Sequence, residues 1–468
     1  MSETWDRDVR ALLERTLLHS RGWWDSLDER PVAARATADD MLASFAEPLP
    51  EEPTPATEVI DLLARRAEPG LSAMGSGRFF GFVIGGAVPA ALAADWLSVA
   101  WDQNAGLREV TPAAAVVEEV AASWLLDLLG LPGHASVGFV TGGCMATFTC
   151  LAAARHHVLA REGYDVERSG LREAPAIRVI TADERHATVD LALRYLGLGT
   201  DHVQRVRTDD QGRIDPGALA EVLASDDAPT IVCLAAGNVN TGSFDDFGAA
   251  VTAAHERGAW VHVDGAFGLW AAASSATARL TAGMADADSW STDGHKWLNV
   301  PYDSGLAIVA HPESHRAAFS VHADYLVQSA SSDPMDLVPE FSRRARGFAV
   351  WAALRSLGRA GVVDLGDRLC RMAQQFATRL AQLPGVAVVN EVVLNQILVR
   401  CDDDDAVTLE VARRVVASGV AFVSPSVFKG RRVLRISVCN GWTSEADVER
   451  TVAAVSTALV AARSHDTR

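Results

Sequence analysis

Short apolar runs alternate with helical stretches from about residue 73 to residue 345, and this alternation constrains the fold more than any other feature of the chain. Most of the runs are apolar on both faces, as the strands of a buried parallel sheet must be. The runs are SVGFVTG, AIRVITA, TIVCLAA, AWVHVDGA, DADSWSTD and SGLAIVA. They predict an α/β domain whose ligands bind beyond the carboxyl ends of the strands.

The regions on either side of this segment follow other patterns. VRALLERTLLHSRGWW and DDMLASFAEPL have apolar positions at helical spacing, and the Pro- and Glu-rich stretch after them predicts a linker near residues 47–57. Near the C-terminus, VAVVNEV, NQILVRC, VAFVSPS and RVLRISV alternate with helical segments and predict a smaller α+β domain. We therefore expect three parts, at residues 1–72, 73–350 and 351–468.

Composition narrows the class of ligand. The formal net charge of −18 over 468 residues argues against nucleic acid or an anionic membrane as a partner. No long apolar run lacks charges, and the acidic, amphipathic start does not have the pattern of a signal peptide. The six cysteines form no CxxC pair and have no zinc-like spacing, which favours free thiols and no metal. We expect a cytoplasmic protein with a small-molecule ligand.

Two charged residues follow strand-like runs. Asp264 ends the run AWVHVDGAFG, where its carboxylate could pair with a protonated ring nitrogen or could simply cap a helix or form a turn. Lys296 lies in STDGHKWLNVPYDSG, a segment with little other charge. A lone lysine is usually a solvated surface residue, but this context favours an amine that faces a pocket and acts as a nucleophile.

Two further places complete the pattern. Thr141, Gly142 and Gly143 join a strand to a helix, so the N–H groups of that turn could bind a phosphate, although a tight turn alone would also need glycine. His186 also follows a strand and begins a helix, where it could cap the helix or stack on an aromatic ring. A phosphate site, a stacking ring, an acid and a lysine, in this chain order, are what pyridoxal 5'-phosphate (PLP) requires.

The chain resembles the group II PLP-dependent amino acid decarboxylases, the family of aromatic L-amino acid, glutamate and histidine decarboxylases. The resemblance rests on GRFFGFV, TGGCMATFTCLAAAR, ADERHATVD, GNVNTGSFDDF, HVDGAFG, DGHKWLNVPYDSG and LRISVCNGWTSEADVER, and extends over roughly four fifths of the chain. It implies PLP fold type I, which is similar to aspartate aminotransferase. That fold has a large domain with a mainly parallel sheet, a smaller α+β C-terminal domain and a helical N-terminal segment.

The resemblance also implies roles for individual residues. Lys296 matches the Schiff-base lysine, Asp264 the partner of the pyridine nitrogen, and His186 the histidine that stacks on the ring. The other cofactor-binding positions that it implies are Gly143, Cys144, Asn238, Ala266 and His295.

Two positions depart from the family's pattern. Asn238 stands where many members have a threonine near the cofactor, and Asp293 stands where some have an asparagine beside the phosphate. A carboxylate next to a phosphate would be unfavourable unless it turns away or is paired. The roles of both residues are therefore open.

The family has a mobile catalytic loop after the lysine, whose tyrosine reaches the site of the partner subunit. HADYLVQSASSDP has the composition of such a loop, and Tyr325 stands at the matching place, although it could also be an ordinary surface tyrosine. By resemblance Tyr325 is the acid that protonates Cα after CO2 leaves. The resemblance also implies a homodimer with shared active sites, on which the N-terminal helices pack.

The expected reaction is α-decarboxylation of an aromatic or other hydrophobic L-amino acid to the amine and CO2. Phe80, Phe82 and Trp101 are the expected substrate contacts, although such residues are also common in a core. Arg78 could instead pair with a side-chain carboxylate and favour glutamate, aspartate or a sulfinate. The chain could also be an aldehyde-forming or transaminating relative, against which Tyr325 counts. It could also be a catalytically silent paralogue, against which the presence of Lys296, His186 and Tyr325 counts.

Overall fold

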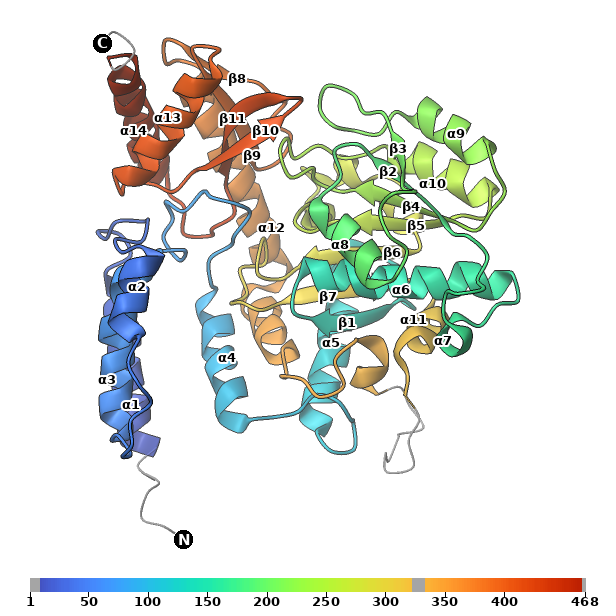
Figure 1. Ribbon diagram of the computed structural model, residues 1–468, viewed down its shortest axis with the longest axis horizontal. Coiled ribbons are helices and arrows are strands. Elements are labelled where there is room, and N and C mark those ends of the chain that lie inside the picture. Colours follow the sequence, from blue (N-terminus) through green and yellow to red (C-terminus); the bar gives the residue numbers. More distant parts are fainter. Residues whose placement is uncertain (1–8, 322–332, 465–468) are drawn as a thin grey trace.

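A seven-stranded sheet forms the centre of the protein in this computed structural model, which describes residues 9–321 and 333–464 (Figure 1). Its strand order is β1-β7-β6-β5-β4-β2-β3. All neighbours from β3 to β6 are parallel, and β7 is antiparallel to both β6 and β1. The strands are β1 (Ser136–Val140), β2 (Arg178–Ala182), β3 (Gln204–Val206), β4 (Thr230–Ala235), β5 (Trp260–Asp264), β6 (Ser289–Asp293) and β7 (Gly305–Val309).

Helices cover both faces of this sheet, which explains why its strands are apolar on both sides. Alternate residues of β4 enter two different cores: Val232 packs with α9 and α10, and Ile231 packs with α6 and α8. The α/β domain predicted from the sequence is therefore confirmed. Its helices are α5 (Pro112–Leu129), α6 (Gly143–Arg161), α7 (Val166–Ser169), α8 (Ala187–Tyr195), α9 (Pro216–Ala224), α10 (Phe247–Glu256) and α11 (Pro312–Phe319). Short 3₁₀ helices lie at η2 (Gly268–Ala273), η3 (Ala278–Thr281), η4 (Met284–Asp286) and η5 (Pro334–Leu337).

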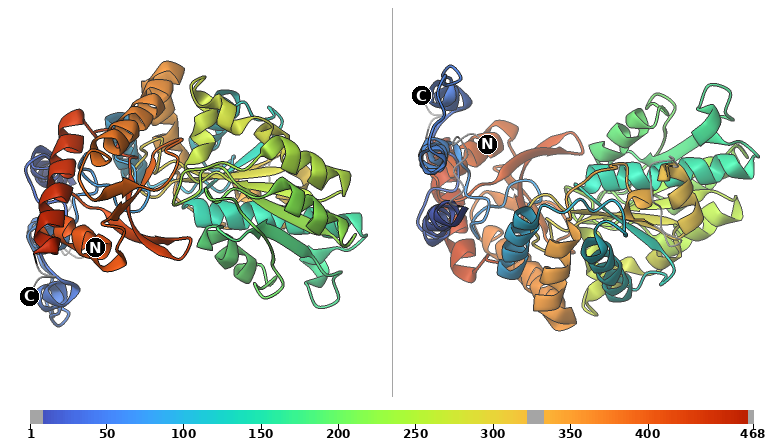
Figure 2. Two further views of the ribbon diagram at one scale, coloured as in Figure 1. Left: turned by 90° about the horizontal axis from the view of Figure 1, so that it is seen from above. Right: turned by 90° about the horizontal axis from the view of Figure 1, so that it is seen from below.

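The C-terminal part, orange and red in Figure 2, has its own sheet apart from the large one. This sheet is antiparallel and four-stranded, in the order β10-β11-β9-β8. The strands are β8 (Val386–Val388), β9 (Gln396–Cys401), β10 (Ser424–Phe428) and β11 (Arg431–Ser437), with helices α13 (Asp405–Ala417) and α14 (Glu445–Arg463). Helix α12 (Gly347–Leu380) connects this part to the large domain and is interrupted at Gly358, where the backbone leaves helical geometry. The boundary expected at residues 350–351 falls inside α12.

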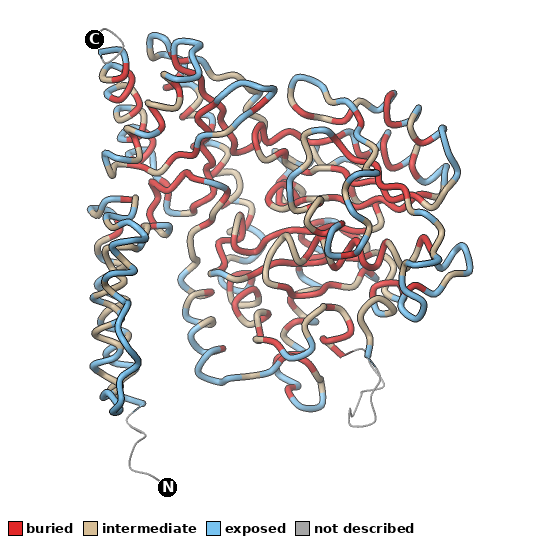
Figure 3. The backbone as a smooth tube through the Cα atoms, viewed as in Figure 1, coloured by how far each residue is buried: buried red, intermediate tan, exposed pale blue. Residues whose placement is uncertain are grey.

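The N-terminal helices extend away from the rest of the chain (Figure 3). They are α1 (Val9–Asp25), α2 (Ala38–Phe45) and α3 (Ala56–Ala67), followed by η1 (Glu68–Gly70), and the proline-rich stretch joins α2 to α3. None of the residues of α1, α2 and α3 is buried. Helix α4 (Pro89–Trp101) follows and packs against α12.

Arg78 ties the N-terminal region to the small domain. Its guanidinium donates to the carbonyl oxygens of Leu27, Asp28 and Arg30, and to that of Val420 beside β10. Burial lowers the pKa of this arginine. Backbone carbonyls accept from both terminal nitrogens of Arg78, which therefore links these segments. Neither terminal nitrogen is left for the side-chain carboxylate expected as its alternative partner, although Nε has no hydrogen-bond partner.

Among the helices of residues 9–321 and 333–464, none is both long and apolar enough to cross a membrane.

Candidate active site

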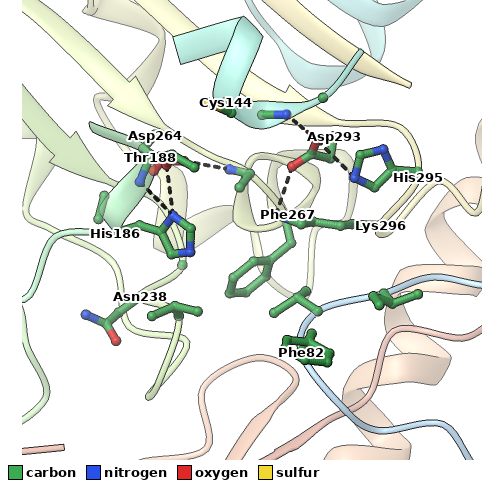
Figure 4. Close-up of a pocket in the computed structure, with 18 of the residues that line it drawn as sticks. Phe82, Cys144, His186, Thr188, Asn238, Asp264, Phe267, Asp293, His295 and Lys296 are labelled. Atoms are coloured by element: carbon green, nitrogen blue, oxygen red, sulfur yellow. Dashed lines mark hydrogen bonds and ion pairs between the residues drawn. The ribbon is translucent and has the colours of Figure 1, made fainter. Parts of the chain in front are cut away.

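A cavity of about 510 Å³ lies at the carboxyl ends of β4, β5 and β6 (Figure 4). This is the edge of the sheet at which α/β proteins bind ligands, and the volume suits a small organic molecule. The predicted site residues that line it are Gly143, Cys144, His186, Asn238, Asp264, Ala266, His295, Lys296 and Phe82. The fold thus brings together residues that are far apart in the sequence.

The turn before α6 forms one wall of the cavity. Gly142 and Gly143 let the chain pass close to β6 and β7, because a Cβ on Gly143 would lie 2.6 Å from Asp293 Oδ2, and one on Gly305 would overlap the backbone of Gly142. Cys144 follows in the first turn of the helix, where burial raises its pKa and disfavours the thiolate. The start of this helix lines the cavity with Gly143 and Cys144, and the N–H groups of a helix start favour an anion such as a phosphate.

Asp293 occupies part of this wall and is fully paired. Its Oδ1 accepts a hydrogen bond from the Gly143 N–H at 2.5 Å and lies 3.2 Å from His295 Nε2. Its Oδ2 lies 2.8 Å from Lys296 Nζ. The sequence left open whether this carboxylate turns away or is paired, and the structure shows it paired with the catalytic lysine candidate and buried to 1% exposure.

His295 is buried beside Asp293. Burial lowers its pKa and the nearby Asp293 opposes this shift. Its Nδ1 accepts from the Ser304 N–H at 3.3 Å, so the proton lies on Nε2, which faces Asp293. The ring stacks on Tyr302 with centroids 4.1 Å apart. His295 thus fixes the orientation of the Asp293 carboxylate.

The backbone of the Lys296 turn is fastened from three directions. Asn299 donates from Nδ2 to Lys296 O at 3.0 Å, and its Oδ1 accepts from the N–H groups of Gly86 and Gly441. A Cβ on Gly85 would overlap Lys296 O, so this glycine is needed for the close approach. These contacts fix the backbone at Lys296, and the sequence offered no signal for those from Gly85, Gly86 and Gly441 because they join distant segments.

Asp264 and His186 form another part of the cavity wall. Asp264 ends β5, and its Oδ1 accepts from the Ala266 N–H at 3.2 Å. His186 caps α8, with Nδ1 accepting from the Thr188 N–H at 3.3 Å, and also lines the cavity. The surrounding protein lowers the pKa of His186 by desolvation, with Asp264 opposing. His186 therefore both caps α8 and lines the cavity, so the cap does not keep its ring from the ligand site.

Asn238 lines the cavity, but the hydrogen bonds of its side chain lie within its own loop and to Glu184. Its Oδ1 accepts from the N–H groups of Asn240 and Thr241, at 2.9 and 3.2 Å, and its Nδ2 donates to Glu184 O at 3.4 Å. An amide at this position therefore shapes the turn after β4. Contact between the Asn238 side chain and the cofactor stays a prediction.

The expected substrate residues separate into two groups. Phe82 lines the cavity with a half-exposed ring and a positive φ of 54°, a strained conformation for a bulky residue that is typical of functional sites. Phe80 is completely buried against Phe376, and Trp101 lies on the surface at the end of α4 against Phe348. The structure does not bring Phe80 or Trp101 to the cavity of this chain. Tyr325 lies outside the described residues.

Arg435 is a cavity residue that was not predicted from the sequence. It is 8% exposed, lines the cavity from β11, and donates to Val239 O at 2.9 Å. Among residues 9–321 and 333–464 no carboxylate lies within ion-pair distance of it, its Nε has no hydrogen-bond partner, and burial lowers its pKa. The available signal was the charged residue Arg435 within the otherwise uncharged stretch VLRISV, because buried strands accept a cation only where it has a partner or a function.

The cavity residues fit PLP. The turn at Gly142 and Gly143 leaves no room for a Cβ and presents N–H groups to an anion, Lys296 offers an amine, and Asp264 offers a carboxylate. His186 adds a flat ring. An α/β fold with these groups at the carboxyl edge of its sheet defines a PLP-dependent enzyme as the class of protein.

Comparisons with known proteins agree with this class. The Pyridoxal-dependent decarboxylase conserved domain matches residues 39–401. Aromatic-L-amino-acid decarboxylase of Bacillus atrophaeus is 26% identical over 442 residues, which cover 89% of this chain and 88% of that protein. Tryptophan decarboxylase 1 of Oryza sativa subsp. japonica is 27% identical over 465 residues, covering 92% and 90%. The chain belongs to the pyridoxal-dependent decarboxylase family and is a PLP-dependent carboxy-lyase.

The solved structure of Oryza sativa TDC with PLP and tryptamine superposes with a TM-score of 0.91 at 24% identity, covering 98% of this chain and 99% of that one. This likeness confirms the expected fold. Other relatives differ in their named activities. Phenylacetaldehyde synthase of a Rosa hybrid cultivar is 25% identical over 90% of this chain, and acidic amino acid decarboxylase of Mus musculus is 26% identical over 67% of it.

Proposed function

We propose that this enzyme removes the α-carboxylate of an L-amino acid with an aromatic or other hydrophobic side chain, and releases the amine and CO2. The observation that carries the proposal is the charge of the cavity wall. Lys296 is balanced by Asp293, which leaves Arg435 as the one cation of the described wall without a carboxylate partner. One unpaired cation can bind one carboxylate of the substrate, which we assign as the α-carboxylate.

The rest of the wall supports an apolar side chain. Phe82, Val83, Ile84 and Phe267 line the cavity, and the one glutamate among the described lining residues, Glu184, is already paired with Lys429 at 3.9 Å. Arg78, which could have favoured an acidic substrate, is occupied by backbone carbonyls outside the cavity. Decarboxylation of glutamate, aspartate or a sulfinate therefore has no second unpaired cation in the described wall to support it.

Each residue contributes one part of the chemistry. Bound PLP supplies the electron sink that accepts the electron pair left on Cα when CO2 departs. Lys296 would hold the cofactor covalently and release the product amine. Asp264 would keep a proton on the pyridine nitrogen, the N–H groups of Gly143 and Cys144 would bind the phosphate, and His186 would stack on the ring. Ala266 is small enough to leave room beneath that ring.

Arg435 would orient the substrate. A cation on β11 fixes where the α-carboxylate lies, and the orientation of the bond about Cα decides which group is lost. Tyr325, by family resemblance, would supply the proton to Cα. A tyrosine at this position favours amine formation over the aldehyde-forming reaction that the name of the rose relative describes.

The direct test follows CO2, amine and aldehyde together when the purified protein is incubated with PLP and a panel of L-amino acids. We expect CO2 and amine in equal amounts from tryptophan, tyrosine, phenylalanine or another hydrophobic amino acid, and little from glutamate or aspartate. A preference for the acidic substrates would contradict the proposal. The variant Lys296→Ala should lose the absorbance band at roughly 420 nm that a PLP–lysine linkage gives.

We also propose a cytoplasmic homodimer. All six cysteines are free thiols, which fits a reducing compartment. The unburied N-terminal helices and the exposed apolar side chains on α4 need a covering surface, and a second copy of the chain with twofold symmetry would provide one.

A further inference from the structure

Asp293 places a carboxylate where the cofactor phosphate is expected. It ends β6 at the sheet edge, and its backbone is fixed because its N–H donates to Ala266 O at 3.0 Å and its carbonyl accepts from Trp270 Nε1 at 3.3 Å. The side chain is therefore directed at the start of α6, where Oδ1 accepts from the Gly143 N–H (Figure 4). The positive end of a helix stabilises an anion at this point.

The same carboxylate balances the lysine. Lys296 Nζ lies 2.8 Å from Oδ2, and His295 donates to Oδ1 from the other side. The cavity thus brings together an ammonium, a helix N-terminus and one internal anion that pairs with both. No other carboxylate in the described part of the chain forms an ion pair with Lys296.

Binding of the cofactor changes this balance. Lys296 would lose its free ammonium when it holds the cofactor covalently, which would weaken its pair with Asp293, and the phosphate would bring negative charge to N–H groups that include Gly143. Asp293 is then a carboxylate close to a phosphate, with its cationic partner weakened, and like charges in a buried site repel.

We propose that Asp293 is a positioning residue that stands in for the phosphate in the cofactor-free chain: it holds Lys296 and the α6 turn ready and, as a consequence, limits how tightly the cofactor phosphate binds. The inference rests on the proposed phosphate position at Gly143 and Cys144. It gives one residue two opposite effects, on the stability of the free protein and on the affinity for the cofactor.

The variant Asp293→Asn separates these effects because it removes the charge and retains the size and an acceptor oxygen for the Gly143 N–H. The dissociation constant of PLP, measured by titration of the cofactor-free protein at the ~420 nm band, should fall about tenfold, which corresponds to roughly 1.4 kcal/mol. The dissociation constant of inorganic phosphate, measured by its competition with PLP, should fall in the same direction. The melting temperature of the cofactor-free variant should fall as well.

Two other variants serve as controls. Asp288→Asn removes a buried carboxylate at the other end of β6, where it accepts from His255, His311 and the Val261 N–H. It should lower the melting temperature and leave both dissociation constants unchanged. Asp293→Ser removes the same charge with a smaller side chain, and should shift both dissociation constants in the direction seen for Asp293→Asn.

The outcomes decide between distinct explanations. Weaker or unchanged PLP binding by Asp293→Asn and Asp293→Ser would overturn the proposal, because a purely structural aspartate lowers stability and affinity together. Tighter PLP binding without tighter phosphate binding would also overturn it, since the effect would then act through the Lys296 amine alone. Either failure leaves the proposed function standing if the wild-type protein shows the ~420 nm band and forms amine from a hydrophobic amino acid.

Discussion

Lys296 and Arg435 are the two long cationic side chains among the described residues that line the cavity, and they differ in what balances their charge. Lys296 has the Asp293 carboxylate at 2.8 Å, whereas Arg435 has one backbone carbonyl and an Nε without a partner. An unpaired buried cation costs stability, and active sites retain such groups for the ligand that completes them. We therefore expect the loss of each charge to change the stability of the protein in opposite directions.

Replacing Arg435 with methionine should reduce activity without destabilising the protein. Loss of a charged hydrogen bond to the substrate carboxylate should lower kcat/KM roughly 100-fold, which corresponds to about 2.7 kcal/mol. The melting temperature should stay the same or rise, because the variant removes a cation whose burial is uncompensated. Steady-state kinetics and thermal denaturation check both parts.

The cofactor spectrum is the control for Arg435. It should be unchanged in Arg435→Met, and Arg435→Lys should recover part of the lost activity because it restores the charge without the planar geometry. A variant with wild-type KM and kcat would show that the substrate carboxylate binds elsewhere.

Replacing Tyr325 with phenylalanine should divert the product. Without the phenolic proton donor, protonation at Cα slows, so the yield of amine should fall and side products such as the aldehyde should rise. Quantifying amine and aldehyde against CO2 from one reaction checks this. An unchanged amine yield would assign the proton to another donor.

At the scale of elements, strand β6 has a carboxylate at each end. Asp293 ends the strand at the active-site edge, and Asp288 precedes Ser289 at the opposite edge. Burial raises the pKa of Asp288, but hydrogen bonds from His255, His311 and the Val261 N–H outweigh it and lower the pKa to about 2. One carboxylate thus serves the cofactor site, and the other stabilises the fold.

The depressed pKa of Asp288 predicts a pH-dependent stability difference. An unfolded aspartate titrates near its ordinary value, so the stabilisation from Asp288 is present above about pH 4 and is lost as the pH falls toward 2. Asp288→Asn should therefore lower the free energy of unfolding by about 2 kcal/mol at pH 5. The difference between the two proteins should shrink steadily below pH 4 in denaturant titrations.

His255 contributes to the same pH profile with the opposite sign. Its hydrogen bond to Asp288 raises the pKa of His255, so that part of the stabilisation is present below the ordinary histidine value and declines as the pH rises through the raised pKa. The largest difference between the wild type and Asp288→Asn is expected between about pH 4 and pH 6.5. A difference that does not vary with pH would contradict these assignments.

At the scale of the whole molecule, the N-terminal helices need a partner surface. Three helices without a buried residue do not hold their positions through their own packing, and α4 beside them exposes Trp96, Leu97, Val99 and Trp101 (Figure 3). A twofold dimer would bury both surfaces. Trp101, which does not reach the cavity of its own chain, would lie within this covered region.

The dimer predicts a sedimentation mass of twice 49.8 kDa. Val99→Glu places a charge on the exposed face of α4, where Val99 is 63% exposed, and should shift the protein toward the monomer and reduce its activity. Val460→Glu is the matched control, because Val460 is 60% exposed on α14, a helix of the small domain. A wild-type protein that sediments as a monomer would contradict the proposal.

Much of the fold followed from local patterns. Six strands of the large sheet were predicted because strands buried on both faces are apolar throughout, and β3 was missed because it is three residues long. The chain order of Gly143, His186, Asp264 and Lys296 predicted that they meet at one edge, since parallel strands end on the same side. The structure places all four around one cavity.

The sequence by itself determined the alternation of strands and helices, the family and the residues that follow each strand, because these depend on near neighbours in the chain. Only the tertiary structure decided which side chains share the cavity and with what partner. Arg435 faces it from the small domain, Phe80 enters the core, Arg78 binds backbone carbonyls, and Asp293 pairs with Lys296 at the start of α6. These outcomes depend on contacts between segments far apart in the chain, and a local pattern carries no record of which distant group will satisfy a buried charge.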